Sequence, residues 1–207
     1  MTDQPKDPPQ QPTDPLRTHA SMFERLNTAE PARRETEWGR FRQRYAPVVA
    51  GFARNLGVRP QDVDDVIQDV FLGFFSVSNK FAYDPAKGRF RGYLKTVTLN
   101  AIRSRVARGV RVNEVALSDL PDDAPALGEQ WDRAWADHVM RRAVEAARAE
   151  YAAHPQTFEA FERYALMRHR AADVARDLGV NVDSVYQAKH RVLETLRAKV
   201  KQIEQED

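Results

Sequence analysis

The sequence predicts an all-α fold, in which a flexible acidic linker joins two small helical domains. Apolar residues recur at three- and four-residue steps in several segments, which is the spacing of one face of a helix. No segment alternates apolar and polar residues as a half-buried strand does. Turn-forming and acidic residues interrupt the helical pattern between the two halves. The predicted divisions are a disordered Pro-rich tail (1–35), a first domain (36–108), the linker (109–135) and a second domain (136–207).

Composition sets limits on the class of protein. Of 207 residues, 42% are apolar and 30% are charged, as in a soluble globular protein. The chain has no cysteine, which excludes disulfides, Cys-ligated zinc, iron–sulfur clusters and thiol nucleophiles and fits the reducing environment of a cytoplasm. Apolar runs fall far short of the roughly 20 residues that span a bilayer, and the polar, Pro-rich start does not read as a secretory signal.

The net charge of +2 is unevenly distributed. Residues 41–111 carry thirteen Lys and Arg against five Asp and Glu, or +8. Residues 112–140 carry one against seven, or −6. A basic segment followed by an acidic one suggests a module that binds a polyanion, with an acidic connector beside it.

Turn residues mark the ends of the helices expected in the first domain. Pro47 lies inside the first periodic segment and predicts a kink or a break, because proline lacks the backbone N–H. Gly57 can take the left-handed conformation that ends a helix. Residues 78–92 contain several turn-forming residues and are expected to be a loop. The helices expected here cover 38–56, 60–77 and 93–108.

Acidic residues gather on one side of the second expected helix. Asp62, Asp65 and Asp69 share that side, opposite the apolar arc, with Gln68 and Leu72 beside them. Acids are favourable at a helix N-terminus, which accounts for Asp62 but poorly for Asp69, two turns further on. The alternative is a docking face for a basic protein surface, with Leu72 as an apolar anchor.

The third expected helix and the loop before it are basic. Phe81, Tyr83, Phe90 and Tyr93 lie among the cations of this segment. Aromatic side chains can stack on bases while cations bind phosphates, which is the combination that single-stranded nucleic acid needs. The alternative is that the aromatics form core and the arginines are ordinary surface. The cations are Lys87, Arg89, Arg91, Lys95, Arg103, Arg105 and Arg108, and the polar face of the helix holds Thr96, Asn100, Arg103 and Ser104.

Residues 170–186, RAADVARDLGVNVDSVY, have the pattern of a helix-turn-helix. Gly179 supplies the turn, Val180 fills the space between the helices and Asn181 can cap the second helix. Glutamine and arginine side chains can read adenine and guanine in a major groove. The alternative is a plain αα-hairpin with a solvated polar face. The exposed side of the second helix is expected to carry Asp183, Tyr186, Gln187, His190 and Arg191.

Two stretches, DVDDVIQDVFL at 62–72 and FAYDPAKGRFRGYLKTVTLN at 81–100, resemble region two of bacterial sigma-70-family factors. The helix-turn-helix at 170–197 resembles region four, in the same order and across a linker. The chain is most similar to the small extracytoplasmic-function (ECF) group. This resemblance implies a promoter-specificity subunit whose partners are core RNA polymerase and promoter DNA, both double-stranded and as a melted non-template strand. It is also compatible with control by an anti-sigma factor.

The resemblance further implies roles for individual residues. The acidic linker would run toward the RNA exit channel, and the loop 79–90 would receive a base flipped out of the non-template strand. The residues that would bind polymerase are Asp62, Asp65, Gln68, Asp69 and Leu72. The residues that would contact the proximal promoter element are Tyr83, Lys87, Arg89, Arg91, Thr96, Asn100 and Arg103. The residues that would contact the distal element are Ser184, Tyr186, Gln187, His190 and Arg191.

Two other classes of function compete with this interpretation. A stand-alone helix-turn-helix regulator would use its N-terminal domain for dimerisation or sensing. An enzyme is disfavoured, because the chain has no HExxH, GxSxG or phosphate-loop pattern, and no metal or cofactor is expected. The five histidines are scattered, each read as a surface or packing residue: His19, His138, His154, His169 and His190.

Overall fold

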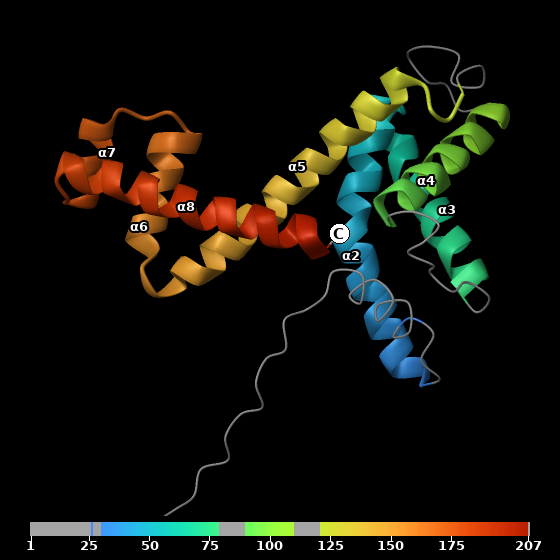
Figure 1. Ribbon diagram of the computed structural model, residues 1–207, viewed down its shortest axis with the longest axis horizontal. Coiled ribbons are helices and arrows are strands. Elements are labelled where there is room, and N and C mark those ends of the chain that lie inside the picture. The colour runs from blue at the N-terminus through green and yellow to red at the C-terminus, as the bar shows by residue number, and fades with distance from the viewer. Residues whose placement is uncertain (1–25, 27–29, 79–89, 110–120, 207) are drawn as a thin grey trace, which may run out of the picture.

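The computed structural model describes Leu26 and residues 30–78, 90–109 and 121–206 (Figure 1). Within these ranges it forms seven α-helices and no strand, which confirms the all-α prediction. The α-helices are α2 (Pro31–Asn55), α3 (Pro60–Ser78), α4 (Phe90–Ala107), α5 (Pro125–Glu150), α6 (Pro155–Phe161), α7 (Ala171–Leu178) and α8 (Val182–Glu206), with the short turns η2 (Tyr151–Ala153) and η3 (Glu162–Leu166) on either side of α6.

Proline begins four of these helices: Pro31, Pro60, Pro125 and Pro155. The first helical position needs no backbone N–H and suits the fixed φ of proline, so these residues define the starts locally. Pro47 lies inside α2, and the helix continues through it. The predicted break there is wrong, because Tyr45, Val48 and Val49 around it are buried and their packing outweighs one lost hydrogen bond.

The core of the first bundle is aromatic. The ring of Phe41 meets the rings of Phe71 and Phe74 edge-on, with centroids 5.5 and 5.4 Å apart. Tyr45 and Phe90 lie 4.9 Å apart and are both fully buried. Edge-to-face contacts of this kind add to the burial of the rings themselves. The aromatic core therefore fixes how α2, α3 and α4 pack together.

Helix α5 corrects the predicted linker. Residues 125–135 were expected to be part of a flexible connector, but they form the first turns of α5. Leu127, Trp131 and Trp135 are buried, and the Trp131 ring lies 5.1 Å from that of Phe52 on α2. The linker prediction fails here because acidic residues occupy only the outer face of the helix, while its inner face completes the core.

The second half of α5 runs on to the C-terminal helices and packs against α8 (Figure 1). Lys199 Nζ on α8 lies 2.7 Å from Glu150 Oε2 at the end of α5. One hydrophobic core includes side chains from both halves of the chain, among them Ala143, Ala147 and Leu196. A smaller cluster surrounds Val174 and Val185 of α7 and α8. The boundary predicted between residues 135 and 136 falls inside the continuous helix α5.

The N-terminal boundary also differs from the prediction. Residues 31–35, expected in the disordered tail, begin α2. Leu26, expected in the same tail, is 1% exposed and packs into the main core. Residues 1–25 and 27–29 of the predicted tail lie outside the described residues.

Candidate nucleic-acid interface and docking face

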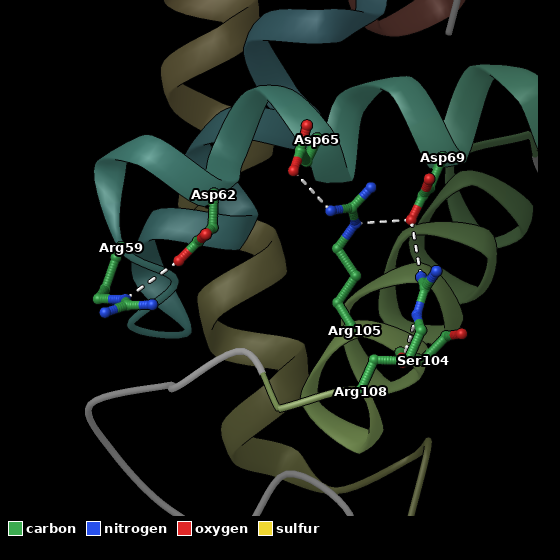
Figure 2. Close-up of polar contacts among 7 residues, drawn as sticks. All are labelled: Arg59, Asp62, Asp65, Asp69, Ser104, Arg105 and Arg108. Carbon is green, nitrogen blue, oxygen red and sulfur yellow. Dashed lines mark hydrogen bonds and ion pairs between the residues drawn. The ribbon is translucent and has the colours of Figure 1, made fainter.

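The acidic face of α3 is bound by arginines. Asp62 Oδ2 accepts a hydrogen bond from Arg59 Nε at 3.1 Å, across the start of the helix. Arg105 of α4 bridges the other two acids: its Nη1 donates to Asp65 Oδ2 at 2.8 Å and its Nε donates to Asp69 Oδ2 at 2.6 Å (Figure 2). The acids therefore have partners within the chain, an explanation that sequence reasoning missed.

Asp69 is the most constrained member of this group. It also accepts a hydrogen bond from Arg108 Nη2 at 3.1 Å, while Arg108 Nε donates to the carbonyl oxygen of Ser104 (Figure 2). The hydrogen bond from Arg105 lowers the pKa of Asp69, although partial burial opposes that shift. The same hydrogen bond raises the pKa of Arg105. The contact therefore stabilises the charged form of both groups and attaches α4 to α3.

Helical spacing groups these residues on two helix faces but does not reveal that the faces meet. Asp65 and Asp69 are four residues apart on α3, and Arg105 and Arg108 are three apart on α4. Each pair therefore lies on one side of its helix. The side chain of Asp65 remains 56% exposed and that of Asp69 27%, so Asp65 keeps the larger surface for an outside partner.

An apolar groove lies beside the acids. Gln68 and Leu72 line it together with Trp38, Phe71 and Phe75, and its volume is ≈ 580 Å³. Leu72 is 56% exposed and Phe75 is 53% exposed, which is high for large apolar side chains. Leu72 therefore belongs to an open apolar surface between α2 and α3, as an anchor residue would. Trp38 and Phe75 also belong to this surface, although their residue types and spacing did not predict it.

Helix α4 presents the expected polar face. Thr96, Asn100 and Ser104 are exposed, and the Thr96 hydroxyl donates to the carbonyl oxygen of Gly92 at 3.2 Å. Leu94 and Ile102 face inward and are buried.

Two of the predicted promoter-facing arginines contact acids from residues 112–140. Arg91 Nη2 lies 2.6 Å from Asp132 Oδ1 of α5, and its guanidinium lies over the Trp135 ring. Arg103 forms an ion pair with Asp122. The acidic segment thus neutralises part of the basic helix beside it. Tyr83, Lys87 and Arg89 lie outside the described residues, as does most of the predicted loop 79–90.

The turn between α7 and α8 forms as the sequence predicts. Gly179 has φ +65°, a left-handed conformation that favours glycine. Asn181 Oδ1 accepts hydrogen bonds from the Ser184 backbone N–H at 2.7 Å and from the Ser184 hydroxyl at 2.8 Å. Asn181 therefore caps α8, and the Ser184 hydroxyl takes part in the cap. In α7, Ala171, Val174 and Ala175 face the core, whereas Ala172 is exposed.

The predicted reading face of α8 is exposed. Gln187, His190 and Arg191 are open to solvent, and Tyr186 is 49% exposed with its ring edge-on to Tyr164. His190 Nδ1 lies 3.5 Å from Glu194 Oε1. Val185, Ala188, Val192 and Leu196 are buried on the opposite side. The spacing of the exposed residues places them on one side of the helix.

Among the described residues, no three or more His, Asp or Glu side chains gather as metal ligands would. No helix in the same part of the chain is long and apolar enough to cross a membrane.

Residues 41–112 match the sigma-70 region 2 family and form a domain of that type. RNA polymerase sigma factor NccH from Alcaligenes xylosoxydans xylosoxydans is 32% identical over 94 residues, which are 42% of this chain and 49% of that protein. The aligned stretch thus spans about half of the relative. No solved structure matches the chain. The matched family is non-enzymatic, in agreement with the prediction from motifs.

Proposed function

We propose that this chain is an RNA polymerase sigma factor of the ECF group. It would bring core polymerase to promoters, read two promoter elements and help to melt the DNA, without catalysing a reaction itself. The match of residues 41–112 to sigma-70 region 2 carries this proposal. The capped α7–α8 pair, placed after that domain as region four would be, supports it.

Polymerase docking is assigned to the apolar groove and the acids along its edge. Leu72 and Gln68 line the groove, so a helix of the polymerase could bury its apolar side there while a basic residue approaches Asp65. Asp62 and Asp69 would contribute less charge than their number suggests, because Arg59, Arg105 and Arg108 already bind them.

Proximal promoter DNA is assigned to the polar face of α4, with Thr96, Asn100 and Arg103, and to Arg91, Tyr83, Lys87 and Arg89. Arg103 and Asp122 have partly exposed side chains, so DNA phosphates can compete for this arginine. The acidic residues would then act as a weak substitute for DNA in the free protein. The remaining part of the acidic segment, residues 110–124, stays the proposed connector toward the RNA exit channel.

Run-off transcription with core polymerase tests the proposed function. With genomic fragments as template, the chain plus core polymerase is expected to initiate at defined sites, and core polymerase alone is not. The competing possibility, a stand-alone regulator with a dimerisation or sensor domain, predicts instead that the chain footprints a palindrome without polymerase. Such a footprint with no gain in specific initiation would contradict the sigma-factor proposal.

Distal promoter DNA is assigned to Ser184, Tyr186, Gln187, His190 and Arg191. Replacing Gln187 and Arg191 by alanine is expected to relax base preference at the distal element, since each bidentate base contact contributes about 1–3 kcal/mol of discrimination. The measurement is run-off transcription from promoters randomised at that element. Lys201→Ala on the same helix is the control, and unchanged preference in the double variant would show that this face does not read the element.

A further inference from the structure

A second groove, unconnected with the assigned docking surface, lies along the seam between α2 and α5. Its volume is ≈ 420 Å³, within the range of ordinary ligand pockets. Each wall is one face of a helix, whose lining residues follow the spacing i, i+3, i+4 and i+7. The series starts at Arg40 on α2 and at His138 on α5. Two helix faces therefore oppose each other across the groove.

The groove is strongly basic. Four arginines line it, Arg40 and Arg44 from α2 with Arg141 and Arg142 from α5, against one acid, Glu145. Glu37 pairs with Arg40 at 2.8 Å, yet the Arg40 side chain remains 71% exposed. Like charges in a concave site repel one another and focus a positive potential, so this arrangement favours a bound anion.

The floor of the groove is rigid. His138 is 2% exposed, and its ring centroid lies 6.1 Å from that of Tyr45 and 5.8 Å from that of Trp135. Both helices belong to the main core at this level. The core thus holds the two helix backbones that carry the arginines at a fixed separation.

The geometry points to a binding site for the phosphate groups of an anionic ligand in this groove. Guanidinium groups match phosphate oxygens in pairs, and a lining charge of four cations against one acid suits a ligand with two or more phosphates better than a single carboxylate. A nucleic-acid backbone and a free polyphosphate share this chemistry. The site needs neither promoter recognition nor polymerase docking, so it stands apart from the proposed function.

Calorimetric titration of the full chain with sodium tripolyphosphate at low ionic strength tests the site directly. Saturable binding is expected. Arg40→Gln with Arg141→Gln, one change on each wall, is expected to weaken it about a hundredfold, since each charge-assisted contact contributes on the order of tenfold. Glu145→Gln is expected to strengthen binding several-fold, a gain that misfolding would not mimic.

The control removes two exposed arginines outside the groove, Arg133→Gln with Arg197→Gln, and is expected to leave tripolyphosphate affinity unchanged. A parallel titration uses a short DNA duplex without a promoter element. If the groove variant weakens binding of tripolyphosphate alone, the ligand is a free anion. If it weakens binding of the duplex alone, the ligand is a nucleic-acid backbone. If it weakens binding of both, the groove is a general phosphate site. No binding of either probe, no effect of the groove variant on either, or an equal loss in the control variant overturns the proposal.

Discussion

Replacing Asp65 and Asp69 by lysine is expected to abolish co-purification of the chain with core RNA polymerase. Asp65 lies one helical turn before Gln68 of the apolar groove and has a 56% exposed side chain, so a lysine there would repel a basic partner. The same change removes the acceptors of Arg105 and Arg108 and places like charges beside them. We therefore also expect a loss of about 2 kcal/mol in the free energy of unfolding, from the lost charge-assisted hydrogen bonds.

A matched variant separates these two effects. Arg105→Glu with Arg108→Glu breaks the same ion pairs from the α4 side and leaves both acids of α3 in place. If the acids dock on polymerase, this variant loses stability but still co-purifies below its melting temperature. Equal loss of co-purification in both variants would mean that the acids act only by holding α4 against α3, and that they are not themselves a docking contact.

Replacing Trp131 by alanine is expected to lower the free energy of unfolding by about 3–5 kcal/mol, the usual cost of removing a large core aromatic. Trp131 is 2% exposed, packs on Phe52 of α2 and lies 5.7 Å from the Trp135 ring. Its loss would leave a cavity where α2 and α5 meet. Urea denaturation followed by far-UV circular dichroism measures the change independently of tryptophan fluorescence.

The control for this prediction is Glu129→Ala, an exposed position on the same helix, which should change stability by no more than about 0.5 kcal/mol. If residues 125–135 were a flexible connector, Trp131→Ala would behave like that control. An equal, small effect of both changes would therefore restore the predicted linker and contradict the packing of α5.

Local features of the fold were accessible to sequence reasoning. The start of α3 at Pro60, the left-handed turn at Gly179 and the Asn181 cap depend on residues within one turn of each other. The inward and outward sides of α8 follow from helical spacing for the same reason. The reading face proposed for α8 could therefore be named before any tertiary contact was known.

Long-range contacts were not accessible in this way. Arg105 meets Asp69 from 36 residues away, and Arg91 meets Asp132 from 41 residues away. These pairs depend on how whole helices cross, which no local pattern specifies. For this reason the acids of α3 were assigned to an outside partner, and their arginine partners within the chain were not predicted.

The sequence by itself determined that the chain is helical, where α3 begins and α7 ends, and which residues of α3, α4 and α8 lie on common faces. It did so because helix periodicity, caps and turns act over a few residues. Only the tertiary structure decided that residues 125–135 complete a core, that arginines of α4 bind the acids of α3, and that α2 and α5 form a basic groove. Those outcomes depend on packing between helices distant in the chain, where burial of Trp131 outweighs the acidic composition around it.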